Sequence, residues 1–410
     1  ATRFFTDEMN RAAHRDPYYR LVPVAGEPDK VDIEFIVEEG RVIDFNISGG
    51  VDTDNGAFAI MSLTMRNFDA TDLPRGFGAA FGEIYGKEAF HGAGQQLDFV
   101  ASPGTQVSNM RIHFVEPDIF GTHLQPTSFD IDLNKRLRRY ASHEEDRADL
   151  RTRLGRRWDY DIFTWIGFVL TEIELSNPDS DGVPPALSYQ ESQGKTRLAG
   201  VLFDASTRSL DNYLVPHKGW WLRSNNVVYS RDLGSDYDYM QNDLRTDFYA
   251  PIGEKEDGTK PVLHVQLDLG AQSTYGDTFA VPYSDRYFLG GSKSLRGFDY
   301  RGVGPFDLLT DYPLGGQTSL SGTVEYFYPL HSIQQPGSYQ RIEAMRASVF
   351  VDFGATDAES WQLDLGELRS SVGFSIGLSY PLPLTLNFGF PMTSFEGDNR
   401  QTFSFSLGTP

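Results

Sequence analysis

The sequence contains no cysteine and no long apolar run. The absence of cysteine excludes disulfide bonds, thiolate metal sites and cysteine nucleophiles. A membrane helix needs roughly 18–20 apolar residues, and the longest run here, residues 162–170, is about half that length. A helical membrane protein is therefore excluded. A membrane β-barrel is not, because every second residue of a barrel strand faces the lumen and is polar.

Basic side chains are also scarce, with 36 against 57 acidic ones and a net charge of −21. Nucleic acid is therefore a disfavoured partner, because binding to phosphates needs a basic face. We expect the excess acidic residues on solvated loops. The content of 40% hydrophobic and 13% aromatic residues excludes wholesale disorder.

Sequence patterns for catalysis and metal binding are absent as well. The eight histidines show no metal-ligand spacing, and there is neither a Gly-x-Ser-x-Gly elbow nor a phosphate-binding glycine loop. We therefore predict no metal, no cofactor and no catalytic residue, and a protein that is not an enzyme.

What the sequence does contain, from Arg41 onward, is alternation of apolar and polar residues. It forms about sixteen segments, many near the 9–11 residues that span a bilayer as a strand. In residues 368–380, Val372, Phe374 and Ile376 share one face, while serines and glycines share the other. Aromatic residues gather at several segment ends, as at a membrane interface: Trp220, Trp221, Tyr326, Tyr328 and Tyr380. The pattern predicts an all-β fold, an antiparallel transmembrane β-barrel of about 16 strands over residues 40–410. The alternative is a soluble β-sandwich or propeller.

Residues 1–39 differ from the rest of the chain. They predict a short helix over 6–15 and a strand pair over 18–24 and 31–38. These elements are too few for a core of their own, so we expect them to be the end of a small α/β domain. No signal peptide opens the sequence at Ala1, so we expect a mature chain or part of a longer one.

The connections between the predicted strands alternate between the two ends of the barrel. We predict outer connections at 52–56, 101–105, 140–145, 177–195, 231–238, 276–313, 354–366 and 391–400. The connection at 380–383 is a short inner turn, whereas 72–91 is too long and glycine-rich for one and has no explanation in the sequence. Residues 276–313 form the longest outer loop, and its bulky residues predict an ordered, functional segment folded into the lumen.

The alternation also predicts an ion pair. Glu325 and Asp352 fall on the polar faces of two neighbouring strands, so both carboxylates point into the lumen. Arg296 of the long loop can supply the cation they need, in bidentate geometry. Loop glycines Gly290, Gly291 and Gly297 allow the backbone to approach the barrel wall. The alternative is an ordinary loop arginine in water.

A barrel removes its sheet edges by pairing its first strand with its last, here residues 41–51 and 401–408. The last segment is short, so this lateral seam has few hydrogen bonds and is the place where the barrel would open. The predicted seam residues are Val42, Ile43, Phe45, Ile47, Phe403, Phe405, Leu407 and Gly408. From the residues alone, a permanently closed seam is an equal alternative.

The segment FLGG (288–291), followed by LRGF (295–298) and RGVGP (301–305), resembles the signature loop of BamA-type outer-membrane assembly proteins. Residues 22–39 are similar to the end of a last POTRA domain, 315–329 to the strand after the loop, and 401–408 to the closing strand. Two features depart from the family: Leu295 replaces a valine, and the sequence ends in GTP (408–410) without an aromatic residue.

The resemblance implies a row of POTRA domains before a sixteen-stranded barrel, with residues 1–39 as the C-terminal part of the last one. It implies that the loop motif Leu295, Arg296, Gly297 and Phe298 acts through the contact of Arg296 with Glu325 and Asp352. It also favours an openable seam that inserts unfolded β-barrel clients into the bacterial outer membrane, with accessory periplasmic lipoproteins as partners. The POTRA part would lie in the periplasm. A polypeptide secretion channel on the same scaffold is the alternative function, and a barrel that only anchors a partner is a third.

Overall fold

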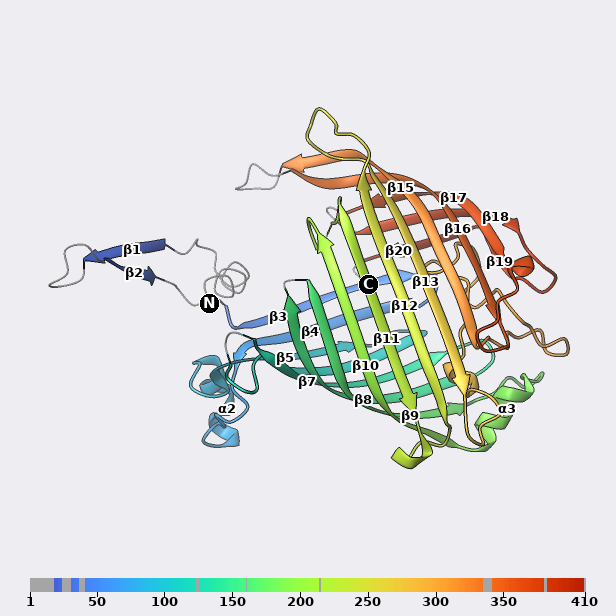
Figure 1. The fold of residues 1–410 in the computed structure, drawn as a ribbon, viewed down its shortest axis with the longest axis horizontal. Helices are drawn as coiled ribbons and strands as arrows, with labels where there is room; N and C mark the ends of the chain where they lie inside the picture. The colour runs from blue at the N-terminus through green and yellow to red at the C-terminus, as the bar shows by residue number, and fades with distance from the viewer. Residues whose placement is uncertain are drawn as a thin grey trace.

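The chain forms a closed barrel of sixteen antiparallel strands (Figure 1). The computed structural model describes residues 18–23, 31–36, 41–122, 125–159, 161–213, 215–334, 341–379 and 382–408. The predicted fold class and strand number are therefore confirmed.

The barrel strands begin with β3 (Ile43–Asp52) and end with β20 (Phe403–Leu407). Between them lie β4 (Gly56–Phe68), β5 (His91–Ser102), β6 (Val107–Glu116), β7 (Thr127–Arg139), β8 (Glu144–Asp159), β9 (Ile162–Ser176), β10 (Lys195–Leu210), β11 (Gly219–Tyr229), β12 (Tyr239–Pro251), β13 (Val262–Thr274), β15 (Thr318–Gln334), β16 (Arg341–Asp357), β17 (Arg369–Leu378) and β18 (Leu384–Thr393). Each pairs with its neighbours along the chain, and β20 pairs with β3 to close the cylinder.

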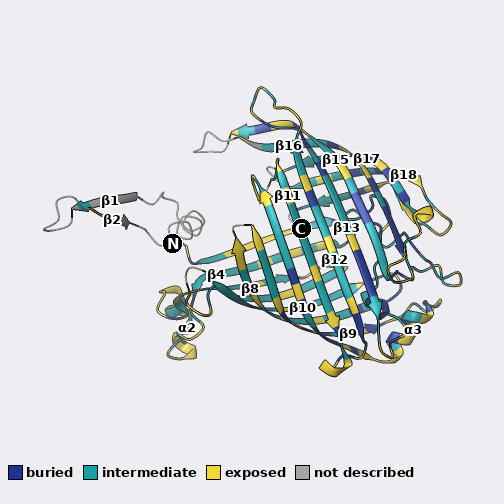
Figure 2. Ribbon diagram, in the orientation of Figure 1, coloured by how far each residue is buried: buried dark blue, intermediate teal, exposed yellow. Residues whose placement is uncertain are grey.

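The alternation along each strand separates an outer apolar face from an inner polar one. In β17, Val372 is 40% and Phe374 42% exposed on the outside, whereas Ser371 is fully buried on the inside. Figure 2 shows the exposed and less exposed bands along the strands. Outward apolar side chains around a closed cylinder are what a lipid-facing barrel requires.

All eight predicted outer connections lie between strands and share one end of the barrel. That end carries the helix α3 (Pro185–Ser192) and the long loop between β13 and β15. The unexplained connection at 72–91 lies at the opposite end and contains the helix α2 (Phe77–Tyr85), both visible in Figure 1. The inner turn predicted at 380–383 lies partly outside the described residues.

Before the barrel, β1 (Tyr18–Pro23) and β2 (Val31–Ile36) form a two-stranded antiparallel sheet, with Tyr18 opposite Ile36. It lies where the sequence predicts a strand pair. The helix predicted over residues 6–15 lies outside the described residues, and the assignment of residues 1–39 to a POTRA domain stays a prediction. No helix in the described part of the chain is both long and apolar enough to cross a membrane.

Candidate functional site

The guanidinium of Arg296 lies inside the barrel between two carboxylates. Its Nε and Nη2 each donate to one oxygen of Asp352 at 2.7 Å, and its backbone N–H donates to the same carboxylate at 3.1 Å. Its Nη1 donates to Glu325 at 3.1 Å, and Nη2 also donates to the hydroxyl of Thr323 at 3.0 Å. The planar fork of the guanidinium therefore uses its bidentate geometry, which an ammonium group lacks.

The strand pattern places these carboxylates. Glu325 lies on β15 and Asp352 on β16, and Thr323 stands directly opposite Asp352. Glu325 is 7% and Asp352 1% exposed, so neither carboxylate is fully hydrated. Ser348 donates a further hydrogen bond to Glu325. Two buried carboxylates repel each other, and a cation between them offsets this repulsion.

These surroundings favour the charged form of Arg296. Burial would lower the pKa of the guanidinium, but the hydrogen bonds to Asp352 and the charges of Asp352 and Glu325 outweigh burial, and the pKa lies above its ordinary value. The guanidinium carbon also lies 3.4 Å from the ring centroid of Phe350, a cation–π contact. The Phe350 ring in turn covers Gly373 of the next strand, where a Cβ would lie 2.4 Å from the ring.

The loop that carries Arg296 has a small core of its own. Its buried apolar residues are Leu289, Leu295, Phe298 and Val303. Gly297 has a φ of +96°, and a Cβ there would lie 3.1 Å from the backbone of Gly389 on β18. Gly290 has a φ of +109°, and a Cβ there would lie 2.2 Å from the carbonyl oxygen of Asp299. Glycine is thus required at both positions by conformation and by space. At Gly291, with a φ of +96°, the nearest atom belongs to Asp54.

The same loop also contacts both sides of the seam. Ser292 donates two hydrogen bonds, from its backbone N–H and its hydroxyl, to the carboxylate of Asp54 in the turn after β3. The short strand β14 (Gly297–Phe298) pairs with β19 (Arg400–Gln401), just before β20. Asn399 exchanges backbone hydrogen bonds of 2.9 Å with the loop. The loop therefore binds the outer end of the first strand and the approach to the last one.

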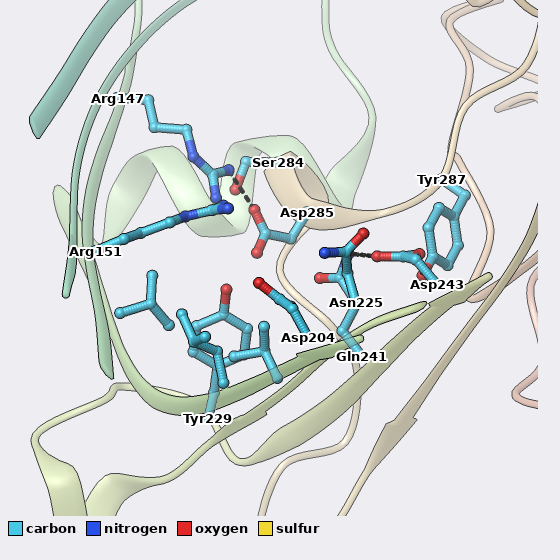
Figure 3. A pocket seen from close by; sticks show the side chains of 13 residues that line it. Arg147, Arg151, Asp204, Asn225, Tyr229, Gln241, Asp243, Ser284, Asp285 and Tyr287 are labelled. Atoms are coloured by element: carbon cyan, nitrogen blue, oxygen red, sulfur yellow. Dashed lines mark hydrogen bonds and ion pairs between the residues drawn. The ribbon is translucent and has the colours of Figure 1, made fainter. Parts of the chain in front are cut away.

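Earlier in the loop, two hydrogen bonds to carboxylates join it to strands β8 and β12. Arg147 of β8 donates to Asp285 at 2.5 Å, and the hydroxyl of Tyr287 donates to Asp243 of β12 at 2.6 Å. Between these contacts lies a polar cavity of about 400 Å³ (Figure 3). Its polar lining includes Arg151, Asp204, Asn225 and Gln241. The cavity belongs to the lumen beside the loop and is lined by charges of both signs.

A second loop arginine is held by aromatic rings. The guanidinium of Arg301 lies 3.8 Å from the ring centroid of Phe288 and 4.0 Å from that of Tyr140, whose hydroxyl accepts a hydrogen bond of 2.8 Å. His143, in the same outer turn as Tyr140, stacks on the Tyr140 ring. Burial and the nearby charge of Arg301 lower the pKa of His143 to about 3. The imidazole is therefore neutral at physiological pH.

The seam itself is short. Within the described residues, Ser406 pairs with Asp52 and Leu407 with Val51, and no other pair joins β20 to β3. The hydroxyl and backbone of Thr53 add hydrogen bonds to the backbone of Phe405. By contrast, β15 pairs with β16 from Thr318 to Gln334. All seam contacts of β20 lie at the outer end of β3.

The strand pairing at the seam includes fewer residues than the sequence predicted. Leu407 pairs with Val51, Phe405 contacts Thr53, and a Cβ on Gly408 would lie 2.3 Å from the carbonyl oxygen of Gly49. Within the described residues, the other predicted seam residues are not joined across the seam. Ile43, Phe45 and Ile47 pair with β4, Val42 precedes β3, and Phe403 packs on Phe388 of β18. The reason is the register, because the five residues of β20 meet the far end of a ten-residue β3.

Sequence reasoning missed Asp54, Asn399 and the β14–β19 pair. The available signal was weak: Asp54 lies in the DTDNG turn (52–56), where aspartate is common in any case. Within the described part of the chain, no group of three or more His, Asp or Glu residues could hold a metal ion.

Residues 90–410 match the family described as the Omp85 superfamily domain. The chain belongs to the Omp85 superfamily. Among its curated relatives, the outer membrane protein assembly factor BamA of Neorickettsia risticii is 24% identical over 407 residues, covering 94% of this chain and 48% of that protein. BamA of Neisseria meningitidis serogroup B is 22% identical, covering 95% and 50%. The chain spans about half the length of the curated relatives it matches.

Solved structures share the fold of this Omp85 chain. BamA from Haemophilus ducreyi lacking POTRA domains 1–3 has a TM-score of 0.74 at 18% identity, covering 99% of this chain and 77% of that one. CdiB from Escherichia coli has a TM-score of 0.59 at 12% identity, covering 98% and 68%. The chain is thus a BamA-type barrel of the bacterial outer membrane, and the curated BamA proteins that it resembles are named as assembly factors, not as enzymes.

Proposed function

We propose that this barrel inserts and folds unfolded β-barrel clients into the outer membrane through an openable seam between β3 and β20. The observation that carries the proposal is the uneven seam. Within the described residues it is paired at its outer end alone, by Val51–Leu407 and Asp52–Ser406. Towards its inner end, Ile43, Phe45 and Ile47 pair with β4 and, among the described residues, have no partner on β20.

An exposed strand edge can pair with another strand, and that is how a client would begin to fold. A client strand that adds to β3 satisfies its backbone hydrogen bonds at a depth where lipid offers none. The long loop keeps the outer end of the seam in place through Asp54 on one side and Asn399 on the other. Opening would therefore start at the inner end and, for a client strand to pair along the whole of β3, would also have to break the pairs of Val51 and Asp52 with β20. Burial of client surface supplies the free energy, without nucleotide.

A disulfide across the seam tests this function. The chain has no cysteine, so Val51→Cys with Leu407→Cys creates a single pair at two residues in register. The matched control, Val372→Cys with Phe390→Cys, joins β17 to β18 within an extended ladder. The full chain in liposomes should accelerate folding of an unrelated reporter barrel. The oxidised seam pair should abolish the acceleration, reduction should restore it, and the control pair should leave it unchanged.

A polypeptide secretion channel of the same family is the alternative function. A channel would move its substrate through the lumen, so it would tolerate the seam disulfide and lose transport when the lumen is blocked. Reporter folding that continues at full rate with the oxidised seam pair would contradict the insertase. An anchor barrel would neither fold the reporter nor conduct ions. Accessory periplasmic lipoproteins stay a prediction from the resemblance, to be tested by co-purification.

A further inference from the structure

The inner connection between β4 and β5 carries an apolar face that nothing in the described chain covers. In α2, Phe77 is 101%, Phe81 84% and Tyr85 82% exposed, and no residue of the helix is buried. The three aromatic residues are spaced four apart, so they lie along one side of the helix. Leu73, just before the helix, is 68% exposed. Figure 2 shows this segment as exposed.

This segment is firmly attached to the barrel at its base. The backbone N–H of Phe90 donates to Asp72 at 2.7 Å, and that of Asp69 donates to Phe90 at 3.1 Å. The Phe90 ring stacks on Phe68 with centroids 5.3 Å apart. Phe68 in turn lies edge-on to Phe114 of β6, at 6.3 Å. The aromatic contacts therefore run from the wall of the barrel to the base of the connection.

The same end of the barrel carries an aromatic girdle. Exposed aromatic residues stand near the inner ends of several strands: Trp158, Trp220, Phe248 and Tyr328. Such girdles lie at the membrane–water interface. Strands β4 and β5 lack an aromatic residue in this position, since their outward pair there is Met65 with Leu97. Asp69 lies four residues beyond Met65, about 13 Å along the chain at roughly 3.3 Å per residue, so the connection that carries α2 starts close to the interface.

We propose that α2 lies in the inner-leaflet interface of the bilayer, with Phe77, Phe81 and Tyr85 inserted among the lipids. It completes the aromatic girdle at β4 and β5, beside the seam strand β3. The helix has nine residues and includes Gly78 and Gly82, so it is a marginal helix in water and gains from an apolar surface. The lipid surface is continuous with the outward face of the barrel. This inference depends on the barrel spanning a bilayer and not on the insertase function.

Charge argues against a partner recognised by electrostatics. The segment from Asp69 to Phe90 contains Arg75 and Lys87 against four acidic residues. Glu83 is turned back towards the connection, where it accepts a hydrogen bond of 2.9 Å from the backbone N–H of Arg75. Binding should therefore rest on the aromatic face and be independent of anionic lipid.

The test places a spin label at position 81 through Phe81→Cys in the otherwise cysteine-free full chain. The control is Glu256→Cys, an exposed site in the inner turn between β12 and β13. Collisions with oxygen and with a water-soluble nickel complex are measured by EPR in vesicles of phosphatidylcholine, with and without phosphatidylglycerol. The label at 81 should meet oxygen several-fold more than the control does, and nickel several-fold less, in both vesicles.

Three results would overturn the proposal. Nickel access at 81 equal to that at 256 would place the helix in water. A label shielded from both reagents would indicate a protein surface over the helix. Insertion that requires phosphatidylglycerol would contradict binding through the aromatic face. Phe77→Cys gives a second reading of the same face if the first variant does not fold.

Discussion

Two junctions of this barrel are held in different ways. Between β15 and β16 the pairing covers Thr318–Gln334, and the guanidinium of Arg296 binds a carboxylate on each strand. Between β20 and β3, within the described residues, the strand pairing consists of two pairs, and Thr53 adds hydrogen bonds to Phe405. One loop serves both, since it supplies Arg296 to the first and reaches Asp54 beside the second. The same loop thus contacts both the extensively paired β15–β16 junction and the sparsely paired β20–β3 junction.

We expect the largest loss of stability from Arg296→Ala, which removes the cation that binds both β15 and β16. Removing one partner of a buried ion pair leaves an uncompensated charge, here two carboxylates, and costs about 3–5 kcal/mol. The midpoint of urea unfolding in detergent micelles should fall accordingly. Arg296→Lys should recover part of the loss, because it restores the charge without the bidentate geometry.

The control for Arg296 is Arg111→Ala. Arg111 also pairs with an aspartate, Asp132, but its side chain is 45% exposed. Exposed pairs contribute less than about 1 kcal/mol. Equal losses for the two variants would show that the lumen ion pair adds nothing beyond an ordinary surface contact.

Gly297→Ala should weaken the same junction less. It adds strain at a φ of +96° and forces the loop away from Gly389, with a cost of about 1–3 kcal/mol. The comparison variant is Gly253→Ala, which has a φ of +84° and no atom within 4 Å of the added methyl group. Both variants carry the backbone strain, and only the first loses the close approach. A larger loss of unfolding free energy at Gly253 would contradict this account.

Gly50→Ala should weaken the pairing at the seam between β3 and β20. Its Cβ would lie 2.1 Å from the carbonyl oxygen of Leu407, so β20 must move away from β3. With so few hydrogen bonds present, each worth about 0.5–1.5 kcal/mol, we expect a loss of roughly 1–2 kcal/mol. Amide hydrogen exchange should rise at Phe405 and Leu407 and stay unchanged on β15. Gly377→Ala, also within a strand but with its nearest atom at 3.5 Å, should leave both regions unaltered.

The smallest effect is expected from two histidines whose contributions to stability change with pH in opposite directions. His143, near Arg301, has a pKa lowered to about 3, chiefly by burial, so its contribution to stability is lost as the pH falls from about 6.5 towards 3. In the inner turn, the hydrogen bond to Glu343 raises the pKa of His217 above 6.5. Its contribution is complete below 6.5 and is lost as the pH rises through the raised value. NMR titration should show the two shifts in opposite directions, and equal pKa values would contradict the burial of His143.

Much of the fold could be predicted because the signal is local. Alternation fixes which side chains face outward, and that parity alone sends Glu325 and Asp352 into the lumen. The position of Arg296 between them also follows, since buried carboxylates need a cation and the glycine-rich loop supplies one. The connection at 72–91 could not be explained in this way. Its helix includes two glycines, so the sequence predicts a helix there only weakly. The role of its aromatic face follows from its position beside the aromatic residues at the inner ends of other strands.

By itself, the sequence determined the strands, their two faces, the end of the barrel at which each connection lies and the charges that meet inside. These properties follow from a period of two residues, which each segment carries independently. The tertiary structure decided the rest. The register of β20 on Val51 and Asp52 and the reach of the loop to Asp54 and Asn399 arise only when the cylinder closes. Closure joins residues more than 350 positions apart, and no local pattern encodes their alignment.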